Sequence, residues 1–242
     1  MSLRRLLYRC LFMLLICSRF GCAQETTVTA SVALVSNGKN MKTRDASNVV
    51  VWLTPLEGTG SAAPTPQSPP RPTLVQHNKG FEPHVLVVPV GSLVEFPNHD
   101  PFFHNVFSLF DGKRFDLGLY EAGSTRDVRF DKPGISYIFC NIHAEMSAVV
   151  IAISTPYYGI SDRKGQIVIP HVAPGRYMSH LWYEAAMPEA LSAFTREVTI
   201  SEDNSTLGVL RLPASKPQEA HKNMYGRDYT PAAPGSPGYQ RP

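Results

Sequence analysis

The sequence predicts an all-β protein. Its apolar residues fall into short runs rich in Val, Ile, Thr and aromatic residues, and Gly, Pro, Asn and Asp interrupt the chain between these runs. No long segment repeats its apolar residues at the period of a helix, whereas short runs bounded by turn residues are typical of strands. Strands of this kind bury their apolar faces by packing sheet on sheet, so we expect β-sandwiches.

Residues 1–23 have the order of a secretory signal peptide. Arg4, Arg5 and Arg9 come first, the apolar residues 11–17 follow, and the small-residue segment Gly21-Cys22-Ala23 ends the pattern. The apolar run is too short to span a bilayer, which needs about 20 residues. We predict a periplasmic or secreted protein without a transmembrane segment. Cleavage after Ala23 is expected, with a lipid anchor on Cys22 as the alternative.

Loss of this leader changes the charge and the cysteine content. The whole chain has 23 basic and 20 acidic residues, and removal of four arginines leaves 19 against 20, which argues against nucleic acid binding. Cys10, Cys17 and Cys22 leave with the leader, so Cys140 is the single thiol of the mature chain. A lone thiol in an oxidising compartment is prone to oxidation, and ligation of a metal would protect it.

Residues 24–72 predict the first strands and a linker. The two expected strands are Val28–Val35 and Asn48–Leu53, which lie within residues 24–56. Residues 57–72 are rich in Pro and Gly. Because Pro cannot donate a hydrogen bond to a strand ladder, this stretch is interpreted as a linker.

Strand signals are most evenly spaced in residues 73–154. The expected strands are His84–Val90, Leu93–Phe96, Asn105–Phe110, Arg126–Phe130, Ser136–Cys140 and Ala148–Ile153. Roughly 80 residues with this spacing suffice for one compact sandwich with its own core.

Residues 155–213 predict a further β segment. Turns are expected at 162–165 and 173–175, and strands at 166–169, 176–183 and 193–200. Residues 214–242 consist of Pro, Gly and polar residues with almost no aliphatic ones. Such a composition cannot bury a core, so this tail is predicted to be disordered.

The candidate ligands lie in a Cys-x-x-His-x-x-Met motif made by Cys140, His143 and Met146. On a helix this spacing would place all three on one face. The strand signals on both sides favour a tight loop instead, which would direct a thiolate, an imidazole and a thioether at one point. A motif this short also occurs by chance, and a lone Met is often a core residue.

An upstream histidine would complete the ligand set. His104 is the preferred candidate because it begins an expected strand after a loop, and His99 is the alternative. One thiolate and two imidazoles with a weak axial thioether are typical of a mononuclear blue copper site. Zinc rarely binds Met and usually takes four Cys or His ligands in structural sites. Haem attachment through Cys-x-x-Cys-His lacks its second cysteine.

The ordered motifs resemble the plastocyanin and amicyanin group of cupredoxins. They are Phe81-x-Pro83, Val87 to Asp100, His104-Asn105-Val106, and Pro133-Gly134 to Met146. The resemblance covers residues 73–154 and implies a Greek-key β-sandwich with one type 1 copper ion. It implies equatorial ligands at His104, Cys140 and His143, an axial ligand at Met146, and a tie between the two ligand loops at Asn105. Glu145 departs from the apolar face that the family usually presents there.

The flanking segments are similar to a carboxypeptidase-regulatory-like sandwich of the transthyretin type. Asp162-x-x-Gly165-x-Ile167-x-Ile169-Pro170 to Tyr177 resembles its second half, and residues 28–35 and 46–53 are strands of the kind expected in its first half. We therefore expect the cupredoxin unit to be inserted into this second sandwich. The alternative is two β extensions packed against the cupredoxin sheet.

These features together predict an exported one-electron carrier that exchanges electrons with redox partner proteins. The chain has no His-x-His pair of the kind found in multicopper oxidases, so we expect no enzymatic activity. Two other functions remain open at this stage. One is a copper carrier or buffer that uses the same ligands, and the other is an exported structural or binding β-module in which copper is incidental.

Overall fold

The computed structural model describes residues 25–36, 39–40, 45–56, 71–109, 112–213 and 222–229. The predicted signal peptide, and most of the linker and tail, lie outside these residues. The described part is nearly all β, which confirms the predicted fold class, and it holds one short helix, α2 (Pro188–Ser192). No helix within these ranges is long and apolar enough to cross a membrane.

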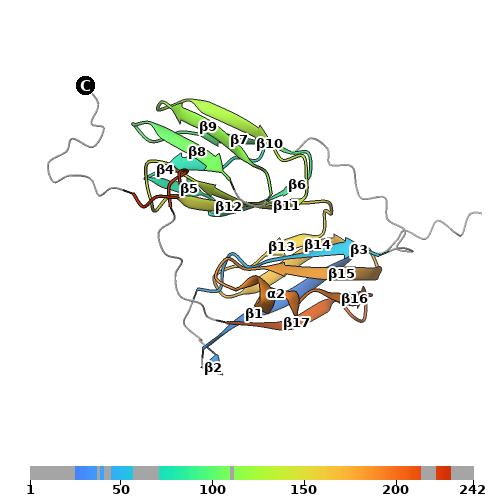
Figure 1. Cartoon of the computed structure of the whole chain (residues 1–242). Coiled ribbons are helices and arrows are strands. Elements are labelled where there is room, and N and C mark those ends of the chain that lie inside the picture. The colour runs from blue at the N-terminus through green and yellow to red at the C-terminus, as the bar shows by residue number, and fades with distance from the viewer. Residues whose placement is uncertain are drawn as a thin grey trace, which may run out of the picture.

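Residues 73–153 form one β-sandwich, here called the central sandwich (Figure 1). Its strands are β4 (Val75–His77), β5 (Gly80–Glu82), β6 (Val85–Pro89), β7 (Leu93–Pro97), β8 (His104–Ser108), β9 (Phe115–Tyr120), β10 (Thr125–Arg129), β11 (Gly134–Phe139) and β12 (Ser147–Ile153). The larger sheet has the order β6-β12-β11-β8-β9, while β10 pairs with β7 and β4 with β5. Phe96, Val106, Phe130, Ile138 and Val150 are among the side chains that fill the core.

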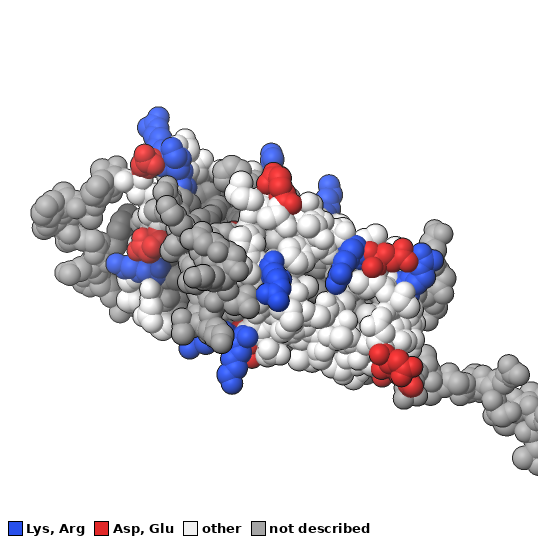
Figure 2. All heavy atoms as spheres, turned by 90° about the horizontal axis from the view of Figure 1, so that it is seen from below, with Lys and Arg blue, Asp and Glu red and all other residues white. Residues whose placement is uncertain are grey.

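The other strands form the flanking sandwich. One sheet has the order β14-β1-β17 with β2 paired to β1, and the other has the order β13-β3-β15-β16. The strands are β1 (Thr26–Ser36), β2 (Lys39–Asn40), β3 (Val50–Pro55), β13 (Tyr158–Ile160), β14 (Gln166–Val172), β15 (Gly175–Trp182), β16 (Arg196–Ile200) and β17 (Thr206–Pro213). On the face seen in Figure 2, acidic and basic side chains are interspersed rather than gathered by sign.

In the sequence, the central sandwich lies between β3 and β13, which are both strands of the flanking sandwich. The chain leaves after β3 and returns as β13, and these two strands are antiparallel neighbours, with Gly159 opposite Val51. Strands from both sides of the central sandwich also pair in the other sheet, where β1 lies between β14 and β17. The flanking sandwich is therefore built from two separate parts of the chain.

Strand β12 joins the two sandwiches. It is buried at every position from Ala148 to Ile153, although successive side chains of a strand point to opposite faces. Ala148, Val150 and Ala152 pack in the central core. Val149, Ile151 and Ile153 pack on the other side in a second apolar cluster, which contains Val50 of β3 and Trp182 of β15. The continuous apolar run in the sequence thus reflects burial on both faces.

The turn between β13 and β14 shows how local sequence fixes the flanking sandwich. Asp162 accepts hydrogen bonds on its Oδ1 from the backbone N–H groups of Lys164 and Gln166, both at 2.8 Å. Gly165 has φ +78°, and a Cβ there would lie 2.6 Å from the carbonyl oxygen of Val32. Only glycine tolerates both the left-handed conformation and this close approach.

Residues 222–229 depart from the expectation of a disordered tail. They return to the central sandwich, where Figure 1 draws them as the short red segment beside its strands. Two hydrogen bonds connect them to the loop between β11 and β12. Apolar content, on which the prediction of disorder rested, does not register polar contacts of this kind.

Candidate metal centre

Strand pairing brings the candidate ligands to one end of the central sandwich. His104 begins β8, and Cys140 directly follows the last residue of β11. The two strands are antiparallel neighbours, with Phe139 opposite Phe107. The start of β8 and the end of β11 therefore lie at the same end of the sheet. The loop 140–146 begins at this end and leads into β12.

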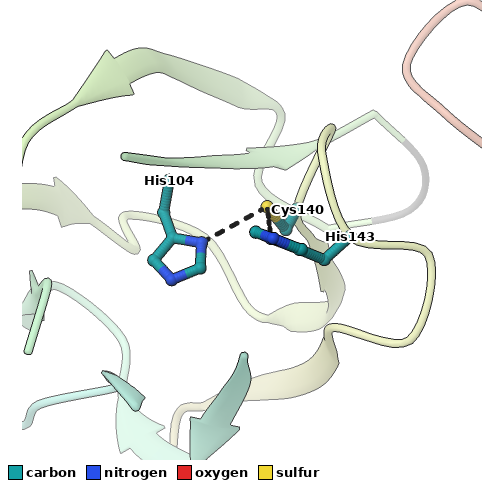
Figure 3. Close-up of side chains that lie close together, drawn as sticks. All are labelled: His104, Cys140 and His143. Atoms are coloured by element: carbon teal, nitrogen blue, oxygen red, sulfur yellow. Dashed lines mark hydrogen bonds between the residues drawn. The ribbon is translucent and has the colours of Figure 1, made fainter. Parts of the chain in front are cut away.

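His104, Cys140 and His143 form a compact cluster (Figure 3). The Cys140 Sγ atom lies 3.8 Å from Nδ1 of His104 and 3.6 Å from Nδ1 of His143. In the described part of the chain, this is the one group of three or more His, Cys, Asp or Glu side chains whose ligand atoms lie close enough together to hold a metal ion, all within 4.8 Å of one another. Metal–nitrogen and metal–sulfur bonds of about 2.0 and 2.3 Å at trigonal or tetrahedral angles put these atoms about 3.5–3.7 Å apart. The cluster thus fits a metal ion.

Burial affects the thiol and the two imidazoles of the cluster in different ways. Cys140 and His104 are fully buried and His143 is partly buried. Burial raises the pKa of the Cys140 thiol and lowers the pKa of both imidazoles, with the nearby His104 also lowering that of His143. Both imidazoles are therefore neutral and able to offer a lone pair. A bound cation would favour the thiolate and so reverse the effect of burial on Cys140.

Asp100 fixes the orientation of the first histidine. Its Oδ2 lies 2.7 Å from Nε2 of His104, so Nε2 donates and Nδ1 keeps the lone pair that faces the sulfur. The carboxylate is buried and accepts hydrogen bonds from the backbone N–H groups of Asn78 at 2.7 Å and Lys79 at 2.9 Å. Burial acts to raise the pKa of Asp100, but these N–H groups and His104 together hold it below its ordinary value.

Asn105 joins the two loops that carry the candidate ligands. Its Oδ1 accepts a hydrogen bond from the backbone N–H of Asn141 at 3.3 Å, and its Nδ2 donates to Asp116 at 2.7 Å. The resemblance stated above assigns this position the same linking role. Asn105 thereby couples the strand that begins at His104 to the residue after Cys140.

Met146 ends the ligand loop and is fully buried in the same apolar cluster as Cys140. The backbone N–H of Cys140 donates to the carbonyl oxygen of Met146 at 3.2 Å. The backbone N–H of Met146 in turn donates to the carbonyl oxygen of His143 at 3.1 Å. These bonds close the loop on itself and hold the ends of the Cys-x-x-His-x-x-Met motif together.

The alternative ligand, His99, lies outside the cluster. It is exposed, and its backbone N–H donates to the carbonyl oxygen of Gln76 at 2.9 Å. Glu145 is also exposed. Phe102 lies beside both histidines, with its ring centroid 5.2 Å from that of His104 and 5.8 Å from that of His143.

Sequence reasoning assigned no role to Asp100 or to the tail. For Asp100 a signal existed, because an acidic residue four positions before a candidate histidine ligand can accept a hydrogen bond from its ring.

The tail contacts the ligand loop at two points. The N–H of Met224 donates to Asn141 Oδ1 at 3.0 Å, and the hydroxyl of Tyr229 donates to the Cys140 carbonyl oxygen at 2.5 Å. Burial raises the pKa of Tyr229, so its hydroxyl is a donor. No sequence pattern predicts these two contacts.

Comparison with known proteins gives structural likenesses only. No family model and no curated protein matches the chain. A purple cupredoxin from Nitrosopumilus maritimus is 21% identical, covering 34% of this chain and 99% of that chain with a TM-score of 0.31. A variant of amicyanin in its Cu(I) form is 18% identical, covering 34% and 80% with a TM-score of 0.32. A copper-containing nitrite reductase from Thermus scotoductus SA-01 is 25% identical, covering 41% of this chain but 25% of that chain, with a TM-score of 0.34.

Proposed function

We propose that the protein holds one copper ion in a type 1 site and acts as an exported one-electron carrier. His104, Cys140 and His143 would be the equatorial ligands and Met146 the axial one. The observation that carries the proposal is the convergence of one buried thiol and two imidazole Nδ1 atoms, with the sulfur 3.6 and 3.8 Å from the nitrogens. Redox partner proteins would supply and accept the electron.

The donor set favours copper over zinc. A thiolate with two imidazoles and a buried thioether at the end of the same loop matches the preference of copper, which cycles between Cu(I) and Cu(II). Structural zinc sites use a fourth Cys or His, and the described residues offer none in this cluster. A weak axial ligand would have to be buried near the thiolate. Met146 meets this requirement, because it is buried in the same cluster as Cys140.

The surroundings of the cluster favour electron transfer over metal delivery. Asp100 holds His104, Asn105 holds Asn141, and backbone hydrogen bonds close the loop, so the ligand atoms are fixed before a metal binds. A fixed geometry suits both oxidation states and keeps rearrangement small. A carrier that hands over its metal needs accessible ligands, whereas Cys140 and His104 are fully buried. His143, the partly exposed member, is the natural point of entry for the electron.

The test is an optical and EPR spectrum of the mature protein loaded with Cu(II). We expect an intense thiolate-to-copper charge-transfer band and a narrow copper hyperfine splitting, and both should vanish in Cys140→Ser. Reversible one-electron voltammetry would then separate an electron carrier from a copper buffer. A wild-type protein that stays colourless with Cu(II) while Cys140 titrates as a free thiol would contradict the proposal.

A further inference from the structure

The chain segment 222–229 is hydrogen bonded to the ligand loop at Cys140 and Asn141. The Tyr229 hydroxyl donates to the carbonyl oxygen of Cys140 at 2.5 Å, across 89 residues of sequence. Tyr229 is partly buried in this position. The backbone N–H of Cys140 already donates within the loop, to Met146. Both backbone polar groups of Cys140 are therefore hydrogen bonded, one by the loop and one by the tail.

A second anchor lies one residue further along the loop. The backbone N–H of Met224 donates to Oδ1 of Asn141 at 3.0 Å. The N–H of Asn141 is held in turn by Asn105, the residue after His104. Asn141 thus connects the tail, the ligand loop and the strand that carries the first histidine. Movement of the tail would therefore affect both the ligand loop and the strand that begins at His104.

The tail segment is itself folded. Oδ1 of Asn223 accepts hydrogen bonds from the N–H groups of Tyr225 and Arg227, both at 3.0 Å. The backbone N–H of Asn223 donates to the carbonyl oxygen of Arg227 at 2.9 Å, and Gly226 takes the left-handed φ of +73° that the turn requires. Met224 lies inside this turn and Tyr229 follows its last residue, Arg227, by two positions, so the turn brings both anchors to the ligand loop.

We propose that residues 222–229 are a built part of the metal centre, in which Tyr229 is a positioning residue that holds the ligand loop at Cys140. The proposal rests on the metal site proposed above. The backbone of Cys140 sets the direction of its Cβ–Sγ bond, and overlap of the sulfur with the metal depends on that direction. The hydroxyl of Tyr229 therefore contributes to how tightly the metal is held and to the electronic character of the thiolate bond.

The test compares Tyr229→Phe, which removes the hydroxyl and keeps the ring, with Tyr225→Phe as a matched control. Tyr225 belongs to the same turn, but this residue is 73% exposed. In the full-length copper-loaded protein, we expect Tyr229→Phe to stay blue while its charge-transfer band and copper hyperfine splitting shift. Copper release to a chelator should speed up roughly fivefold, the factor expected for loss of one hydrogen bond. Tyr225→Phe should match the wild type in both measurements.

A further variant and a metal-free measurement complete the test. Asn223→Ala breaks the turn without touching the ligand loop, so it should reproduce the effect of Tyr229→Phe. Alkylation of the Cys140 thiol in the metal-free protein should be faster in both variants and unchanged in Tyr225→Phe. If neither the alkylation rate nor the spectrum of Tyr229→Phe differs from the wild type, the proposal is overturned. A wild type that binds no copper would refute the proposed function, and the alkylation rates would still decide whether the tail holds the loop.

Discussion

Asp100 acquires its role only from the fold around it. The carboxylate needs the backbone N–H groups of Asn78 and Lys79 to stay ionised while buried, and both come from the turn between β4 and β5. It then determines which nitrogen of His104 faces Cys140. A buried negative charge beside a ligand also favours the more positive oxidation state of a bound metal.

We expect Asp100→Asn to keep copper but to raise the reduction potential. The amide oxygen still accepts from Nε2 of His104, whereas the negative charge that stabilises Cu(II) is lost. Cyclic voltammetry should show an upward shift on the order of 100 mV, from the Coulomb energy of one charge a few ångströms from the metal. Asp127→Asn, at an exposed position of β10, is the control and should shift the potential little. An unchanged potential in Asp100→Asn would show that the carboxylate does not act on the metal.

The sequence was sufficient to find the clustered residues and, through the resemblance, the link made by Asn105, but it did not reveal the contacts of Asp100 and Tyr229. Cys140 and His143 are three residues apart, so a tight loop between strands brings them together whatever the rest of the fold. His104 follows from the same logic once its strand is placed. Tyr229 approaches Cys140 through a tail without apolar periodicity, and contacts of this kind depend on tertiary structure that no local pattern encodes.

At the level of elements, β12 contributes side chains to two apolar clusters. Its alternating residues complete two different cores, so one strand stabilises both sandwiches. The sequence predicted this strand correctly as Ala148–Ile153, but a continuous apolar run does not reveal which neighbours cover each face. It missed β2, β4, β5 and β13, which are only two or three residues long, and also β9 and β17. Of the last two, β9 is an edge strand interrupted by Gly118, and β17 is an edge strand that contains Gly208. Edge strands have one exposed side and a correspondingly weak apolar signal.

Shortening an apolar side chain on the face of β12 that packs against the flanking sandwich should destabilise the whole protein. Ile151 is 1% exposed and packs between the sandwiches, so Ile151→Ala removes buried methyl groups and leaves a cavity. We expect a loss of about 2–4 kcal/mol in the free energy of unfolding, measured by denaturant titration. Val168→Ala, at a position 55% exposed on β14, should cost less than about 0.5 kcal/mol. Equal effects of the two substitutions would mean that the interface contributes nothing to stability.

At the scale of the whole molecule, His84 links the two sandwiches by a polar contact. Its Nε2 lies 2.6 Å from Oε2 of Glu184 in the flanking sandwich, and its Nδ1 lies 3.1 Å from the carbonyl oxygen of Ser147, beside Met146. Both partners are acceptors, so only the protonated ring can donate to both at once. The hydrogen bond to Glu184 raises the pKa of His84 above its ordinary value.

This link makes stability depend on pH. A raised folded-state pKa stabilises the protein fully below the unfolded value of about 6.5, and the contribution is lost as the pH rises through the folded value. The difference in melting temperature between wild type and His84→Gln should therefore be largest near pH 5.5 and shrink toward pH 8.5. A difference that grows with pH would contradict the assigned direction.

The pairing of β1 with β17 has a consequence for how the chain is made. Synthesis proceeds from the N-terminus, and the central sandwich has all its strands once residue 153 has emerged. β1 is the first strand in the described part of the chain, yet its parallel neighbour β17 is the last one there, with Leu34 opposite Leu212. Until then β1 has an open edge that invites pairing with other chains. The central sandwich, with His104, Cys140 and His143, can thus fold while the flanking sandwich is still incomplete. A chain cut short before β17 would carry this cluster without residues 222–229, next to a sheet edge that is prone to aggregation.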